Sequence, residues 1–181
     1  MIARVLAAAL LLSFTSTAQK APEPQQSVPW RETLQNRLAI YGHRNWIVIA
    51  DSAYPLQSGP GIETIVSNED QISTVRHVLA AIRRQRHVRH IIYTDNELKF
   101  VPEGDAPGIG AYRQELASFV SDALTVPHDD IIRKLDEAGR SFNVLIIKTN
   151  MTLPYTSVFF ELRAAYWSDE AEQRMRQSIR P

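Results

Sequence analysis

Five apolar residues in a row, Trp46-Ile47-Val48-Ile49-Ala50, are the feature that most limits what this chain can fold into. A strand that is apolar at every position has both of its faces covered, which is typical of sheets packed between helices. Further largely apolar stretches occur at 91–93, 144–147 and 157–162, and segments with helical apolar spacing lie between the first three strands. The alternation predicts a layered α/β domain with helices on both faces of its sheet, and it leaves the order of the strands open.

The expected helices follow from apolar spacing and from their start and stop residues. They cover 29–41, a segment that Ser67 caps and that continues to Ile82, residues 112–120, a segment from His128 or Asp129 to Gly139, and the tail 168–180. Proline and glycine make 55–61 and 100–108 loops.

The first 18 residues have the three parts of a secretory signal peptide. Arg4 gives a positive start, 5–14 is apolar, and Ser16-Thr17-Ala18 is a small-residue exit. The apolar run is about ten residues, whereas a membrane span needs roughly 20. We therefore predict a signal peptide at 1–18, a polar linker at 19–28 and one domain at 29–181. The mature protein is expected in the periplasm or secreted, without a membrane anchor.

Charge and composition exclude several classes of function. The chain has 20 basic and 20 acidic residues and a pI near 7.0, which argues against a nucleic-acid partner because such proteins usually carry a basic face. It has no cysteine, so disulfides, thiolate metal sites and thiol nucleophiles are absent. No phosphate loop, nucleophile elbow or dinucleotide fingerprint occurs.

Asp51 is the most informative single residue, because ligands of open α/β sheets bind where strands end. A turn aspartate that accepts amides of the following loop is the alternative. His43 precedes the same strand and suits proton transfer at neutral pH, although a capping cation at a helix end fits it too. The intervening strand separates the two by over about 20 Å if it is straight. They share a site only if the chain folds back or a neighbouring subunit supplies one of them.

Three further clusters have two interpretations each. The basic run 83–90 would face phosphates or complement a helix dipole. His128-Asp129-Asp130 would ligate a metal or begin a helix. Tyr155 would stack on a sugar or fill the core at a strand entry.

Taken together, the pieces resemble the ribose pyranase / fucose mutarotase family. The first family signature is Gly-His, a polar stretch, an apolar strand, and Asp followed closely by Pro, which stands here as residues 42–55, from Gly42-His43 to Asp51 and Pro55. The second is an apolar strand running into Thr, as at 146–149, and then a Tyr-small-Asn triplet, here Tyr155-Thr156-Ser157. Arg133 falls where the fucose branch has a substrate-contacting Arg.

The resemblance implies a three-layer α/β/α domain with a mixed, mostly parallel sheet. It further implies an isomerase that opens and recloses the ring of a monosaccharide, without a cofactor or a metal. By similarity, His43 is the proton donor, and Asp51, Arg133, Tyr155 and Ser157 bind the sugar. The family also implies a homo-oligomer with sites near the contacts between subunits.

Two other functions stay open. A non-catalytic monosaccharide-binding protein of the same fold is one, because Ser157 stands where the family has Asn. A metal-dependent hydrolase that uses His128 and Asp130 is the other.

Overall fold

The computed structural model describes residues 29–179. The predicted signal peptide and linker therefore lie outside the described residues. The elements follow in the order α1 (Trp30–Ile40), β1 (Trp46–Ala50), β2 (Ile62–Val66), α2 (Gln71–Arg83), β3 (Val88–Asp95), the 3₁₀ helix η1 (Asn96–Phe100), α3 (Ile109–Ala117), β4 (Leu124–Val126), α4 (His128–Ser141), β5 (Val144–Lys148), β6 (Val158–Ala164) and α5 (Asp169–Ile179).

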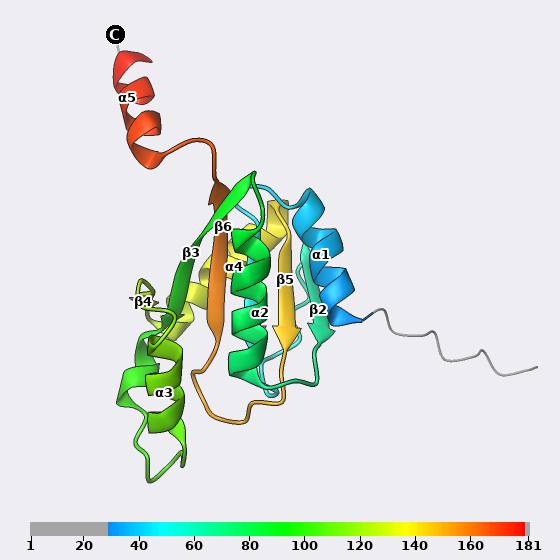
Figure 1. The fold of residues 1–181 in the computed structure, drawn as a ribbon, viewed down its shortest axis with the longest axis vertical. Coiled ribbons are helices and arrows are strands. Elements are labelled where there is room, and N and C mark those ends of the chain that lie inside the picture. The colour runs from blue at the N-terminus through cyan, green and yellow to red at the C-terminus, as the bar shows by residue number, and fades with distance from the viewer. Residues whose placement is uncertain (1–28, 180–181) are drawn as a thin grey trace, which may run out of the picture.

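The strands form one six-stranded sheet in the order β2-β5-β1-β6-β3-β4. Strand β6 is antiparallel to both of its neighbours, and the other pairs are parallel. Five strands therefore end, and β6 begins, on one side of the sheet, which we call its carboxyl end. The opposite side, where β1 and β3 begin and β6 ends, is the amino end (Figure 1).

Helices cover both faces of the sheet, as the alternation of apolar segments predicts. The side chains of Ile47 and Ile49 join a core with α1, α2 and α3. Those of Trp46 and Val48 point to the other face and join a second core with α4. All five residues of β1 are buried, so the apolar run reports a central strand. The three-layer α/β/α architecture with a mixed, mostly parallel sheet is confirmed.

Strands β2 and β4 are absent from the sequence-based expectation. They lie at the two ends of the strand order, and β4 has only three residues, none of them fully buried. Neither strand has a continuous apolar run, because each has a neighbour on one side only. Helix α4 continues past Gly139, where we expected it to stop. A Cβ on Gly139 would lie 2.6 Å from Ile62 Cγ1, so this glycine permits close packing of helix and strand.

Helix α5 stands apart from the layered body, beyond the end of β6 (Figure 1). None of its residues is fully buried. Within residues 29–179, no helix is both long and apolar enough to span a bilayer.

Candidate functional site

Polar side chains from four segments meet at the carboxyl end of the sheet. Asp51 follows β1, Asp95 is the last residue of β3, and His128 begins α4 directly after β4. Val158, the first residue of β6, pairs with Ile49 and with Thr94, so the residues just before it lie between the ends of β1 and β3. The topology therefore brings Asp51, Asp95 and the 155–157 segment to one place.

Asp95 and His128 form the centre of this cluster. The Asp95 side chain is fully buried, and its Oδ1 lies 3.0 Å from Nδ1 of His128. Burial raises the pKa of Asp95 to about 6 and outweighs the lowering effect of His128, and Glu97 and Asp51 add smaller upward contributions. Its Oδ2 is buried without a hydrogen-bond partner among the described residues. A carboxylate that holds Nδ1 leaves Nε2 of the imidazole free for a substrate.

Tyr155 completes this side of the cluster in a strained backbone conformation. Its φ is +56°, in the left-handed region that non-glycine residues rarely adopt. Its ring meets the His128 ring edge-on, with centroids 5.4 Å apart and planes at 84°. The residue is 39% exposed, so part of Tyr155 is accessible to a ligand. Strain of this kind persists only where the surroundings enforce it, and it concentrates at functional sites.

A buried hydrogen-bond network fixes the loop that carries Tyr155. The carbonyl of Thr156 accepts from Gln71 Nε2 at 2.7 Å and from the Tyr112 hydroxyl at 2.6 Å. The Gln71 amide oxygen accepts from the Thr149 hydroxyl, which ties the end of β5 to the same point. These groups come from α2, α3 and the β5–β6 loop, and all are buried. The network therefore fixes the backbone next to Tyr155 from the buried side of the loop.

Asp51 confirms its interpretation as a turn aspartate, and its role in ligand binding stays a prediction. Its Oδ1 accepts the amide of Ala53 at 2.9 Å, as a turn aspartate does. The residue is half-buried at the carboxyl end, and its charge acts on the pKa of Asp95. The remaining carboxylate oxygen can accept a hydroxyl group.

His43 lies at the other end of the sheet. It sits in the turn before β1 and is exposed, and it lines a cavity together with Arg44 and Trp167. The five residues of β1 alone separate the two ends by about 16 Å. A single copy of the chain therefore does not bring His43 and Asp51 together.

The two remaining candidates differ in their environment. Arg133 lies on the solvent side of α4, where its 70% exposed side chain pairs with Asp130. No contact joins it to the Asp95–His128 pair. Ser157 is 1% exposed and sits beneath Tyr155, next to the first residue of β6.

Sequence reasoning missed Asp95 and the contact that it makes with His128. Asp95 ends a strand in the same manner as Asp51, so the rule that singled out Asp51 applies to it equally. His128 was considered as a metal ligand or a helix start. It is indeed the first residue of α4, but its partner is a residue 33 positions earlier, which local sequence does not reveal.

The residues that the sequence offered as metal ligands pair with other side chains in the structure. His128 pairs with Asp95, and Asp130 pairs with Arg133. Residues 29–179 contain no group of three or more His, Asp or Glu side chains arranged to hold a metal ion.

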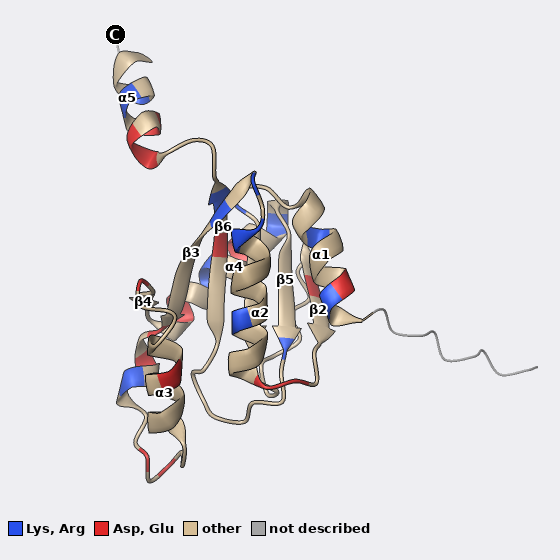
Figure 2. Cartoon of the chain, in the orientation of Figure 1, with Lys and Arg blue, Asp and Glu red and all other residues tan. Residues whose placement is uncertain are grey.

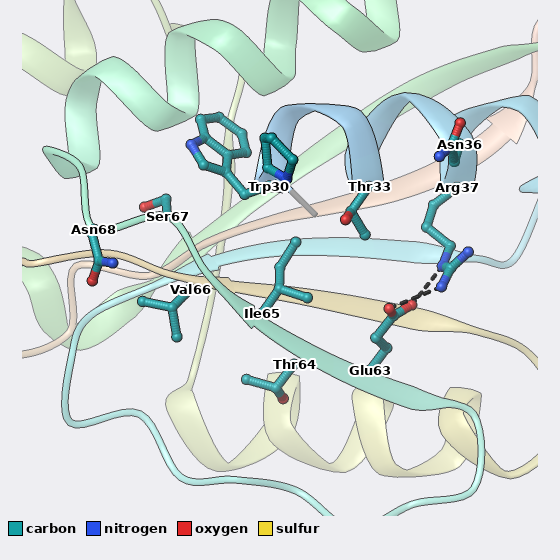
Figure 3. Close-up of a pocket in the computed structure, with 11 residues that line it drawn as sticks. Trp30, Thr33, Asn36, Arg37, Glu63, Thr64, Ile65, Val66, Ser67 and Asn68 are labelled. Carbon is teal, nitrogen blue, oxygen red and sulfur yellow. Dashed lines mark hydrogen bonds and ion pairs between the residues drawn. The ribbon is translucent and has the colours of Figure 1, made fainter. Parts of the chain in front are cut away.

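A cavity of about 790 Å³ lies away from this cluster, between α1 and β2. Figure 3 shows Arg37 and Glu63 facing each other across it, joined by hydrogen bonds of 2.5 and 2.9 Å. Because its two charged groups satisfy each other, this cavity offers no reactive group, and the Asp95–His128 cluster is the better candidate site.

Comparisons with known proteins agree with the fold. The sequence matches the RbsD / FucU transport protein family over residues 31–162. Comparison with curated proteins gives no match. The structure is similar to that of Bacillus subtilis RbsD complexed with D-ribose, with a TM-score of 0.51 and 18% identity over 72% of this chain and 91% of the other.

Two further solved structures have the same likeness. The fucose mutarotase of Streptococcus pneumoniae in complex with L-fucose has a TM-score of 0.50 and 19% identity, over 76% of this chain and 97% of the other. FucU from Bifidobacterium longum has a TM-score of 0.50 and 14% identity, over 75% and 96%. The fold and the family match define an α/β protein with an RbsD-like mixed sheet. The chain belongs to the RbsD / FucU family.

Proposed function

We propose that this protein is an exported monosaccharide isomerase that speeds the opening and reclosure of a hemiacetal ring. The observation that carries the proposal is the buried Asp95 carboxylate that holds His128 against Tyr155, beside Asp51. This arrangement offers a base and hydroxyl-binding groups at one place. The relatives complexed with D-ribose and L-fucose support a reducing sugar as the ligand.

The reaction needs two proton transfers, one from the sugar and one to it, so the composition and the charge of the sugar stay the same. A base removes the proton of the anomeric hydroxyl, the bond between the anomeric carbon and the ring oxygen breaks, and the ring oxygen takes up a proton. Reclosure on the other face of the carbonyl, or through another hydroxyl, gives the second anomer or ring size. In the proposal, His128 is the base through Nε2, because Asp95 occupies Nδ1.

His43 is the proposed proton donor to the ring oxygen, and it comes from a second copy of the chain. Charge favours this assembly. The carboxyl end carries Asp51, Asp95 and Asp129, whereas the amino end near His43 carries Arg44, Arg89 and Arg163. Figure 2 shows the basic residues where β6 ends and where α2 leads into β3. Opposite charges on opposite ends suit a head-to-tail contact, which closes into a ring in a symmetric oligomer.

The other candidates bind the sugar in this proposal. Asp51 accepts a hydroxyl, Tyr155 offers its ring face and its hydroxyl, and Ser157 shapes the floor. Arg133 extends from α4 into solvent and is proposed to reach a sugar hydroxyl near the subunit contact.

Saturation-transfer NMR on a panel of reducing sugars tests the proposal. Irradiating one anomer should lower the signal of the other only when the protein is present, for at least one sugar of the panel. If every sugar exchanges at the buffer rate, the protein is not a mutarotase or pyranase.

A non-catalytic monosaccharide-binding protein is the second candidate. The separation of His43 from Asp51 within one chain favours it, because a single copy would hold a sugar without the donor. Sedimentation combined with titration calorimetry separates the two functions. A monomer that binds a sugar without exchange supports the binding protein, and an oligomer with exchange supports the isomerase.

Export is part of the proposal and has its own test. Expression of the full-length chain in a bacterial host, followed by N-terminal sequencing of the periplasmic or secreted protein, should give Gln19 as the first residue. An uncleaved chain that stays in the cytoplasm would contradict it.

A further inference from the structure

The tail of the chain builds a second cavity at the amino end of the sheet. The family match ends at residue 162, whereas β6 continues to Ala164 and leads to α5. Between this tail and the sheet lies a cavity of about 480 Å³. Its lining includes His43 and Arg44 before β1, Arg89 and Arg163 from β3 and β6, and Trp167 from the tail. The cavity thus lies between the matched domain, which supplies His43, Arg44 and Arg89, and a tail that the family match does not cover.

The lining is rich in guanidinium groups. Four arginines face two carboxylates there, those of Asp169 and Glu172. Arg89 pairs with Asp169 at 3.0 Å, but the side chains are 36% and 68% exposed. Exposed pairs of this kind are weak and screened by salt, so a ligand anion can displace the Asp169 carboxylate. Arg176 pairs with Glu172 and Arg163 with Glu161, so among the described residues Arg44 is the lining arginine that has no carboxylate partner.

Arg44 is the most available of these cations. Its guanidinium lies over the Phe142 ring, 5.5 Å from the centroid, and no carboxylate of residues 29–179 lies within 4 Å of it. Its φ is +71°, the left-handed region, next to His43. The only strained non-glycine residues other than an asparagine are Arg44 and Tyr155 among those described, and Tyr155 is in the candidate site. An enforced conformation at Arg44 is consistent with a ligand-binding role.

Arg163 also has a hydrogen-bond donor, its Nε, that lacks a well-formed partner among the described residues. Its Nε lies 3.1 Å from Glu161 Oε1, yet it is buried and makes no well-formed hydrogen bond in the described part of the chain. Glu161 also accepts the Tyr93 hydroxyl at 2.8 Å, so it is shared. A ligand oxygen at the exposed face of this guanidinium would find a charged donor that no carboxylate fully occupies.

Two exposed aromatic rings flank the same cavity. Tyr166 is 79% exposed and Trp167 is 45% exposed, although large aromatic side chains are usually buried. The Trp167 indole N–H is held by Glu172 at 2.8 Å, which fixes the ring beside the arginines. Aromatic faces bind the C–H faces of sugars, and guanidinium groups bind oxyanions in pairs of hydrogen bonds. A volume of several hundred Å³ suits a small molecule rather than a polymer.

We propose that this cavity binds the oxyanion of an acidic carbohydrate, either a phosphate ester or a carboxylate, and that the tail thereby selects anionic sugars for the site that His43 serves. The catalytic part of this inference rests on the proposed function, and the inference adds the class of substrate, an anionic sugar. Arg44 and Arg163 hold the oxyanion, and Trp167 covers the sugar ring. In an assembly that places His43 at a neighbour's Asp95–His128 cluster, the same cavity lies beside the sugar.

Titration calorimetry of the full mature chain with three probes tests the proposal. The probes are D-glucose 6-phosphate, D-glucuronate and D-glucose, at low and at high salt. At least one acidic sugar should bind tenfold or more tightly than D-glucose, and the preference should shrink as salt rises. Preference for the first probe indicates a phosphate ester, and preference for the second indicates a carboxylate. Equal binding of all three, or no binding of either acidic sugar, overturns the proposal.

The variant Arg44→Asn provides the matched test, because asparagine tolerates the left-handed backbone. It should lower the affinity for the preferred acidic sugar about tenfold and leave D-glucose unchanged, with an unaltered melting temperature. Arg174→Gln, an exposed arginine of α5 outside the cavity lining, is the control and should change neither. Unchanged affinity in Arg44→Asn overturns the proposal.

Exchange measurements separate this inference from the proposed function. Anomer exchange of neutral sugars without any preference for acidic ones keeps the isomerase and overturns the anion site. Tight, Arg44-dependent binding of an acidic sugar without exchange supports the anion site and overturns the isomerase.

Discussion

The two ends of the sheet differ in the kind of chemistry that they carry. The carboxyl end holds a buried carboxylate, a histidine that it orients and a strained tyrosine, and hydrogen bonds from α2 and α3 fix the loop that carries the tyrosine. The amino end holds an exposed histidine among arginines and aromatic rings, beside a helix that the core does not cover. The carboxyl end is thus held by buried hydrogen bonds, whereas the amino end is open to solvent. In the proposed function, a complete site combines these two ends from separate copies.

Replacing His43 gives the largest expected effect. His43→Ala should lower anomer exchange at least 100-fold, since general acid catalysis contributes about 10²–10⁴. The side chain is exposed, so the melting temperature should stay the same. His87→Ala is the control, because His87 lies at the same end of the sheet with its ring bonded to the Tyr41 carbonyl. Exchange in His43→Ala equal to wild type would remove His43 from the mechanism.

The carboxyl end should show its own pH dependence through Asp95. The raised pKa of about 6 means that the ionised form is disfavoured in the folded state. The resulting stability is complete below the unfolded pKa of about 4 and is lost as the pH rises through 6, by roughly 3 kcal/mol. Exchange should change in the opposite direction, increasing through pH 6 as Asp95 ionises and orients His128.

Asp95→Asn tests both consequences together. Urea unfolding at pH 4 and at pH 7 should show a smaller difference in the variant than in the wild type. The exchange rate should fall about tenfold or more and lose its rise near pH 6. If the wild type and the variant show the same difference in free energy of unfolding between pH 4 and pH 7, Asp95 does not carry this penalty.

Tyr155 distinguishes strain from ordinary packing. Tyr155→Gly relieves the positive φ, and it should leave the free energy of unfolding unchanged or raise it by about 1 kcal/mol. Sugar affinity should fall about tenfold, because the ring and the hydroxyl are lost. Tyr155→Ala, which loses the ring but keeps the strain, should be the less stable of the two in urea unfolding. The reverse order of stability would mean that the strain is unimportant.

Arg133 should give the smallest effect. Arg133→Ala should raise KM up to about tenfold with kcat unchanged, which corresponds to the loss of one hydrogen bond from a charged group. Lys134→Ala, at the next exposed position of α4, serves as the control. A KM equal to that of the wild type would leave Arg133 as a surface residue paired with Asp130.

The fold could be predicted well where strands are central, and poorly where they lie at the ends of the sheet. The run at 46–50 is apolar throughout because β1 is covered on both faces. Strands β2 and β4 were not predicted because each is partly exposed and lacks such a run. Gly139 was taken as a helix stop, whereas it is required for contact with Ile62, which only the packing reveals.

The candidate site divides in the same way. Asp51 could be placed because its position after a buried strand is a local signal. The pairing of Asp95 with His128 joins residues far apart in the sequence, and the strained Tyr155 precedes a carbonyl, that of Thr156, which Gln71 and Tyr112 hold from other elements. Such features arise from tertiary contacts. His43 lies a strand's length from the cluster, so its part in the site depends on the assembly of copies.

Complementation between two inactive variants tests the shared site most directly. His43→Ala and His128→Ala are each expected to be inactive, since each lacks one end of the site. Co-expressed and purified as mixed oligomers, they should regain about a quarter of the wild-type exchange rate, because about one contact in four joins an intact His43 to an intact His128. Mixed oligomers that are as inactive as either variant alone would contradict a site built from two copies.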